Sequence, residues 1–222
     1  MGLLAEGQSG QQMNEDGQAI GGKIGYFGLS EWWLSSFTEE ERSLIKSIYA
    51  PLAAGSGISL VTGDILMTSQ TVLSFLTDLA SWFAKDEERW IAYRIFYKAE
   101  DLIDAKTDPL DLHFLYHRKI KILYKDREKA GLDATIEACT QQIALSQKSS
   151  AAFKALGGAL PCHGGYEQLA IILEKQKRYE DAIEVSKKAL AEGWNGTWDK
   201  RIERCRKKLL RGASLNQRAD QG

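Results

Sequence analysis

The sequence predicts an all-α protein built of stacked antiparallel helical hairpins. Apolar residues recur at spacings of three and four along most of the chain, which is the helical pattern. Prolines occur at only three positions, Pro51, Pro109 and Pro161, and all stand at joints between periodic segments. No pair of alternating segments joined by a hairpin turn signal interrupts this pattern, so the sequence gives no indication of a sheet.

The composition is ordinary for a soluble globular protein of one or two domains. The 222 residues are 44% hydrophobic and 27% charged, with a formal net charge of -1. A chain of this length buries roughly 70% of the surface that its unfolded form exposes, so it can form a substantial core. The balanced charge argues against a general nucleic-acid coat protein but allows a local charged patch.

The cysteines indicate a reducing compartment. Cys139, Cys162 and Cys205 are odd in number, and no two of them have CxxC spacing, so a disulfide framework is not expected. The sequence has no run of about 18 apolar residues for a transmembrane helix. The first residues lack the basic and apolar regions of a signal peptide. We therefore expect a cytoplasmic protein with no membrane partner.

The N-terminal region divides into a polar tail and an aromatic segment. Residues 1–22 are rich in Gly, Gln, Ser and Asn, which predicts a disordered tail. Residues 24–37 are crowded with aromatic and aliphatic side chains, and we expect this segment to cap one end of the helical stack. Trp32 and Trp33 are adjacent and cannot both face the same core, so Trp32 is a candidate for partner contact.

The helices are predicted from their caps and their apolar spacing. Thr38 and Glu41 form a capping box that begins a helix, and Pro51 should end it. Pro109 follows Asp108 at a natural first-turn position, and Gly131 should break the chain. We expect an N-terminal helical region over 23–108, a repeat region over 109–211 and a flexible tail over 212–222. Within these regions the expected helices lie at about 72–83, 91–102, 109–123, 132–143, 165–176, 179–192 and 198–211.

One hairpin in the C-terminal third resembles a tetratricopeptide (TPR) repeat. The family requires an aromatic residue, then Leu and a small residue, and later two further alanines, because small residues stand where the paired helices cross. These places are filled at the family's spacing by Tyr166, Leu169, Ala170, Ala182 and Ala189. The sequence departs from the pattern at three positions, with Leu173 in place of Tyr, Ser186 in place of Phe and Trp194 in place of Pro.

A weaker echo of the repeat lies upstream. The segment 132–143 aligns with 179–190 at a shift of 47 residues, but Thr135 stands in place of the important Ala182. This segment is either a degenerate repeat, with the helix from Pro109 as its first half, or an unrelated helix. The stretch from Leu160 to about Glu203 also resembles a tail block of uncharacterised prokaryotic proteins, which implies no activity.

The resemblance implies a concave groove that grips a peptide or a partner helix. The inner positions of this groove would be Gly164, Glu167, Gln168, Ile171 and Glu174. The variant of the family that clamps a C-terminal carboxylate needs basic and amide residues where Glu167 and Ile171 stand, so that clamp is not expected. A mixed apolar and acidic groove would suit an apolar or basic segment. The alternative is that a neighbouring helix of the same chain fills the groove.

The last helix carries a basic face opposite its apolar stripe. A basic face can bind phosphates, or it can be an ordinary solvated surface near a helix C-terminus. No zinc-finger or RNA-binding signature accompanies it. A second basic cluster lies within residues 118–127. The basic face of the last helix consists of Lys200, Arg204, Lys207, Lys208 and Arg211.

Residues with the potential for chemistry are few. His113 and His117 are four apart, which places both on one helix face, where they could share a metal with His163, Cys162 or Asp111. Position 114 is Phe, however, so the HExxH zinc motif is absent, and one partly buried and one exposed helix residue are the simpler interpretation. No motif identifies a catalytic, cofactor or metal site.

The sequence thus favours a protein–protein interaction scaffold or adaptor that uses a helical-repeat groove. The partner is a protein or peptide that the sequence does not identify, and self-association through a helical face is also consistent with the pattern. The alternative is a nucleic-acid-associated protein that uses the basic last helix.

Overall fold

The computed structural model describes residues 20–56 and 59–219, and within them the regular structure is helical. An isolated parallel bridge between Cys162 and Asn195 is the one extended pairing in these ranges. The predicted all-α class is therefore confirmed. The predicted tail of residues 1–22 lies outside the described residues except for its last three. Two compact units divide the chain, Met1–Phe75 and Leu76–Gly222, whereas the sequence placed a regional boundary after residue 108.

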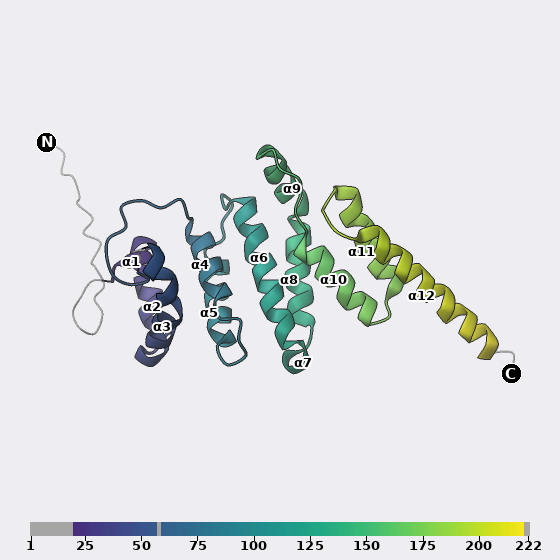
Figure 1. The fold of residues 1–222 in the computed structure, drawn as a ribbon, viewed down its shortest axis with the longest axis horizontal. Coiled ribbons are helices and arrows are strands. Elements are labelled where there is room, and N and C mark those ends of the chain that lie inside the picture. The colour runs from purple at the N-terminus through teal and green to yellow at the C-terminus, as the bar shows by residue number, and fades with distance from the viewer. Residues whose placement is uncertain (1–19, 57–58, 220–222) are drawn as a thin grey trace. The chain divides into compact units, whose positions relative to one another are not determined.

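The first unit contains α1 (Gly22–Tyr26), α2 (Ser30–Ser36) and α3 (Glu39–Ser56) (Figure 1). The start of α1 is held by the loop of residues 59–63. Backbone N–H groups of residues 21–24 donate to the carbonyl oxygens of Val61, Gly63, Ser59 and Leu60, at 2.7–3.2 Å. These bonds satisfy donors that have no partner inside a helix. The loop thus serves as the cap of α1.

Gly22 is required for this approach of helix and loop. Its φ is +56°, and a Cβ there would lie 2.5 Å from the carbonyl oxygen of Ser59. A side chain at this position would therefore be strained and would push the loop away. The backbone of the loop at residues 59–63 thus packs directly against the backbone at the start of α1.

The aromatic segment of residues 24–37 forms the core of this unit. Ile24, Trp33 and Phe37 are buried, and the Phe27 ring stacks on Phe75 with 5.2 Å between centroids. Burial of large aromatic and aliphatic side chains is the main source of stability in a unit of this size. The helices α1 and α2 occupy most of the segment, and its role as a cap of the helical stack stays a prediction.

The capping box at Thr38 is confirmed, but the predicted end of its helix is wrong. The Thr38 N–H donates to Glu41 Oε2 at 2.9 Å, and the Glu41 N–H donates to Thr38 Oγ1 at 3.3 Å. The helix α3 continues through Pro51 to Ser56. A proline inside a helix removes one backbone hydrogen bond and crowds the carbonyl group one turn earlier, and a helix can absorb both effects as a kink.

The second unit is a row of helices joined mostly by short connections. The helix α4 (Val72–Ser81) spans the division between the units, and α5 follows at Arg89–Asp101. Asp108 caps α6 by accepting the Leu110 N–H at 2.7 Å, and Gly131 stands between α7 and α8 with a φ of +78°. The remaining elements are α6 (Pro109–Leu123), η1 (Tyr124–Asp126), α7 (Arg127–Ala130), α8 (Asp133–Ala144), α9 (Ser146–Ala155), α10 (Gly164–Lys175), α11 (Tyr179–Glu192) and α12 (Trp198–Ala219).

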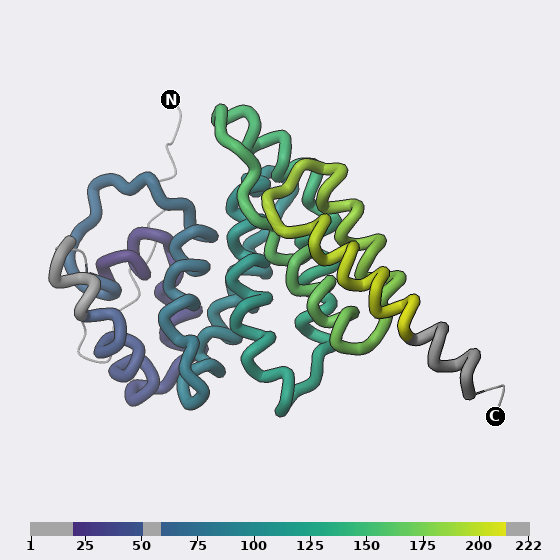
Figure 2. Tube along the Cα trace, turned by 45° about the vertical axis from the view of Figure 1, so that its right-hand side comes forward, coloured from purple at the N-terminus to yellow at the C-terminus, as the bar shows by residue number. Residues whose placement is uncertain are grey.

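Helices in this unit pack as successive pairs. The helix α6 packs against α8, α8 against α10, α10 against α11, and α11 against α12 (Figures 1 and 2). Ala170, Ala182 and Ala189 are fully buried, so α10 and α11 meet through small residues. The structure is thus compatible with a helical repeat over this region, in which each pair covers the apolar face of the next.

Two features of this unit differ from the prediction. The helix α9 was not expected, and it packs against α6. The helix α12 continues to Ala219, so the expected tail of residues 212–222 is helical over its described part. The residues beyond Ala219 lie outside the described range.

A buried glutamine joins three elements of the stack. Gln142 of α8 is fully buried; its Nε2 donates to the His113 carbonyl of α6 at 2.8 Å, and its Oε1 accepts the Gly165 N–H of α10 at 2.6 Å. Gly165 must be glycine here, because a Cβ would lie 2.8 Å from the Cys139 carbonyl oxygen. The start of α10 is therefore fixed against both α6 and α8.

Candidate functional site

The predicted groove residues on α10 do not form one open surface. Glu167 is exposed and accepts a hydrogen bond from Cys162 Sγ at 3.2 Å. Gln168 and Ile171 are partly exposed. Glu174, in contrast, is engaged by the last helix, and only 11% of its side chain is accessible. The last helix therefore covers the Glu174 end of α10, whereas the alternative considered from the sequence was that a neighbouring helix fills the whole groove.

Glu174 is the centre of an ion cluster between α10 and α12. Its carboxylate accepts from Arg201 at 3.0 Å, from Arg204 at 2.7 Å through two nitrogens, and from Lys208 at 2.8 Å. The hydrogen bonds from Arg204 and Lys208 lower the pKa of Glu174 to about 2. The carboxylate is thus ionised at all physiological pH values, and it offsets part of the positive charge of α12.

The predicted basic residues of α12 surround one shallow depression. Arg204 and Lys208 also contact Glu174, and Lys207 forms an ion pair with Glu203 at 2.6 Å. Two carboxylates therefore compete with any external anion for this face. The depression has a volume of about 340 Å³ and is lined by Lys200, Glu203, Arg204, Lys207, Lys208 and Arg211.

Trp32 is partly exposed, while the adjacent Trp33 is buried. The Trp32 ring contacts Phe37 edge to face, with 5.4 Å between ring centroids. Trp32 therefore contributes to the core of the first unit with one side and presents the other to solvent.

The three histidines of the chain come together between α6 and the start of α10. His113 and His163 have 5.3 Å between ring centroids, and His113 and His117 have 6.3 Å. The His113 ring lies parallel to the Trp194 ring at 5.4 Å, so the imidazoles stack among aromatic rings rather than converge on one point. In the ranges that the structure covers, no three His, Cys, Asp or Glu side chains are placed to hold a metal ion.

Burial keeps these histidines neutral. Loss of solvation lowers the pKa of His113 and of His117 to about 4 and that of His163 to about 3. One nitrogen of each ring is buried without a hydrogen-bond partner: Nδ1 of His113, Nδ1 of His117 and Nε2 of His163. Such groups are uncommon in folded proteins and call for a physical explanation.

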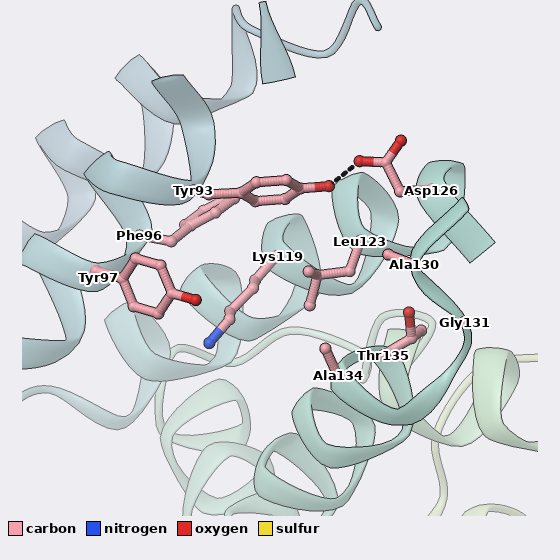
Figure 3. A pocket seen from close by; sticks show the side chains of 10 residues that line it. All are labelled: Tyr93, Phe96, Tyr97, Lys119, Leu123, Asp126, Ala130, Gly131, Ala134 and Thr135. Carbon is pink, nitrogen blue, oxygen red and sulfur yellow. Dashed lines mark hydrogen bonds between the residues drawn. The ribbon is translucent and has the colours of Figure 1, made fainter. Parts of the chain in front are cut away.

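A largely apolar pocket lies between α5, the end of α6 and the start of α8 (Figure 3). Its volume is about 150 Å³. Tyr93 and Tyr97 of α5 form one wall, and the small residues Ala130, Gly131 and Ala134 form the opposite wall. The small residues leave the space that larger side chains would fill. A concave and mostly apolar surface of this kind suits an apolar ligand group.

The polar groups around this pocket are paired with one another. The Tyr93 hydroxyl donates to Asp126, which also accepts from Arg89. Lys119 Nζ binds both oxygens of Glu100 at 2.6 Å. These pairs fix the rim without leaving an unpartnered charge on it, so the pocket favours a neutral, apolar group over an ion.

The sequence analysis did not identify this pocket. Its signal lies in α5, where Tyr93 and Tyr97 are four residues apart on a side of the helix that differs from the stripe of Ile91 and Ile95. The Tyr97 side remains open, with 66% of the residue exposed. A large exposed aromatic residue beside small residues of another helix is typical of a binding surface. The sequence does not show which small residues lie beside Tyr97, because they belong to a different helix.

Comparison with known proteins adds no relative. No protein-family model matches the chain, and neither the curated proteins nor the solved structures that were compared include a match. In the described part of the chain, no helix combines the length and the apolarity needed to cross a membrane.

Proposed function

We propose that this protein is a protein-binding scaffold that receives an apolar side chain of its partner in the pocket between α5, α6 and α8. The pocket itself carries the proposal. A cavity of about 150 Å³ with apolar walls is large enough for a benzene-sized group. A phenylalanine or leucine side chain on a peptide or a partner helix is a group of this size, and central apolar anchors of this kind dominate protein interfaces.

The surroundings of the pocket support a protein rather than a small metabolite as the ligand. Tyr97 extends the apolar surface beyond the cavity, since it is largely exposed at the rim. Tyrosine provides a large contact area at a small cost in side-chain entropy. Arg89 and Tyr93 tie the α5 wall to Asp126 of η1, so this wall is held in place without a ligand.

We infer that the helical pairs of the second unit are related to TPR hairpins. The fully buried Ala170, Ala182 and Ala189 at the meeting of α10 and α11 support this inference, as does the buried Tyr166 beside them. Thr135 is buried at the place where the echo of the repeat requires a small residue. On this interpretation α6 and α8 form a degenerate hairpin, and the pocket exists because its second helix begins with small residues.

A peptide selection tests the proposed function and requires no identified partner. A displayed library of random peptides is selected on the wild-type protein, and binders are then measured against two variants. Ala134→Leu places a larger side chain in the pocket, and Ala144→Leu makes the same change at an exposed position of the same helix as a control. We expect the selected peptides to share an aromatic or aliphatic residue and to bind Ala144→Leu like the wild type.

Ala134→Leu should weaken these peptides at least tenfold, which corresponds to about 1.4 kcal/mol. Peptides that lack a common apolar residue, or that bind both variants equally, would contradict the proposal. Circular dichroism and thermal unfolding of both variants show whether the helical stack is retained.

The nucleic-acid alternative rests on one observation, the depression that is lined by five cations of α12. Its weakness is the neutralising effect of Glu174 and Glu203. Fluorescence anisotropy with a single-stranded and a duplex oligonucleotide at two salt concentrations tests it, because phosphate binding must weaken steeply with salt. Binding that is lost in the double variant Lys200→Gln, Arg211→Gln would support this alternative.

A further inference from the structure

We propose that His113, His117 and His163 form an acid-sensitive joint that attaches α10, and with it α11 and α12, to α6 and α8. The proposal concerns the stability of this attachment and is independent of the pocket. The first argument is the position of the cluster, which lies where the start of α10 meets α6 and the loop residue Trp194.

His163 is the N-cap of α10, and it can act as a cap only while neutral. Its Nδ1 accepts the Tyr166 N–H at 3.3 Å, and its residue is fully buried. A proton on Nδ1 would remove the acceptor and turn the cap into a donor that faces another donor. The usual capping residues, Ser, Thr, Asp and Asn, accept this bond throughout the neutral range, so a histidine makes the cap dependent on pH.

His117 contacts the same helix end from α6. Its Nδ1 lies only 2.5 Å from the position that a Cβ of Gly164 would take, so only a glycine allows this close approach. A protonated imidazole here would place a positive charge against the N-terminal end of α10, whose own dipole is positive at that end. His113 adds a third buried ring between His163 and His117, which is stacked on Trp194.

The charged groups around the cluster do not stabilise protonated rings. Arg118 and Lys121 of α6 act on His117, and both lower its pKa. On the side of α10 and α11, the Glu192 carboxylate is one residue removed from the cluster, where it accepts from Tyr166 Oη at 2.9 Å and from Trp194 Nε1 at 3.0 Å. From α8 the cluster meets Gln142, whose backbone, like that of His163 itself, raises the pKa of His163 by less than burial lowers it, and from α9 it meets the ring of Phe153.

The direction of the effect follows from linkage. The pKa of each ring is lower in the closed joint than the value of about 6.5 of a solvated histidine, so the open form binds more protons below pH 6.5. Closure is therefore fully stable above that pH and weakens as the pH falls toward the lowered pKa values, which are about 4 and 3. At pH 5 each histidine that becomes solvated favours opening by about 30-fold.

Hydrogen exchange on the full chain between pH 7 and pH 5 tests the joint. After correction for the intrinsic pH dependence of exchange, protection of the amides at the start of α10 should fall at least 30-fold, while protection in α5 should change less than threefold. His163→Asn retains a capping side chain without a titrating group. It should make the fall in protection at α10 between pH 7 and pH 5 about 25-fold smaller than in the wild type.

A direct titration of the wild-type imidazoles by NMR provides a second measurement that does not depend on any variant. We expect all three rings to remain neutral in the folded protein at pH 5.5. A ring that titrates near pH 6.5 while the fold is intact would overturn the proposal. So would unchanged protection of α10 at pH 5, or an equal loss of protection in α5 and α10.

Discussion

Replacement of Gln142 by leucine tests how the stack is held at its centre. The change keeps a side chain of similar size but removes both hydrogen bonds of the amide, to the His113 carbonyl and to the Gly165 N–H. The two losses are unequal. The Gly165 N–H belongs to the first turn of α10 and has no helical acceptor, whereas the His113 carbonyl lies inside α6 and retains its helical bond.

The magnitude follows from this difference. A buried N–H without a partner costs about 1–3 kcal/mol, and the lost bond to the carbonyl costs about 0.5–1.5 kcal/mol. Gln142→Leu should therefore lower the free energy of unfolding by about 2–4 kcal/mol, measured by urea denaturation at pH 7.5. Gln147→Leu, at an exposed position in the first turn of α9, is the control and should stay within about 0.5 kcal/mol of the wild type. A loss below about 0.5 kcal/mol for Gln142→Leu would refute the argument that this side chain joins the three helices.

Three further changes test other parts of the structure. Thr38→Ala removes one half of the capping box of α3 and should destabilise the first unit by about 1 kcal/mol in urea denaturation, and an unchanged midpoint would contradict the cap. Ala182→Leu should cost about 1–3 kcal/mol by overpacking the contact of α10 with α11, and a neutral result would show that this contact is not close-packed. Glu174→Gln should cost about 1–2 kcal/mol at pH 7, after allowance for the partly exposed cations, and Glu184→Gln on the exposed side of α11 is its control. Because the pKa of Glu174 is lowered to about 2, the difference between Glu174→Gln and the wild type should be constant above pH 5 and should shrink as the pH falls toward 2.

The helices that begin or end at a strong local signal could be predicted from the sequence. Asp108 and Pro109 mark the start of α6, and Gly131 marks the break before α8, because each acts through its own backbone and side chain. The prediction that Pro51 ends α3 was wrong because a single proline does not always end a helix. Proline disfavours a helix interior by about 3 kcal/mol or more, but contacts elsewhere in the helix can exceed that cost.

The helix α9 could not be predicted because its buried face is polar. Ser146, Ser149 and Ser150 are buried, and Ser149 Oγ donates to the Pro109 carbonyl oxygen at 3.3 Å. A search for recurring apolar residues finds little in this segment, since its buried positions carry serine hydroxyl groups, of which those of Ser146 and Ser149 contact groups far along the chain. Only the folded chain shows where those acceptors lie.

The parts of the candidate sites that depend on local spacing could be predicted, and the parts that depend on contacts between distant segments could not. The spacing of His113 and His117 places them on one face of α6, and His163 was named only as a possible third metal ligand. The sequence does not show that the His113 ring stacks on His117 and meets His163 edge to face. Glu174 and the cations of α12 were treated as separate surfaces, because nothing local links positions that are about 30 residues apart. Their pairing depends on the path of the chain between α10 and α12.

The contacts of α12 limit how this part of the chain can vary in length. Trp198 Nε1 donates to the Trp194 carbonyl oxygen at 2.7 Å, and Arg201, Arg204 and Lys208 all reach the same carboxylate. One residue added within this stretch would turn the following part of the helix by about 100° and carry its cations away from Glu174. In related sequences, insertions and deletions should therefore be rare between 194 and 208 and more frequent in the exposed turn of residues 104–106, where a longer loop disturbs no such contact.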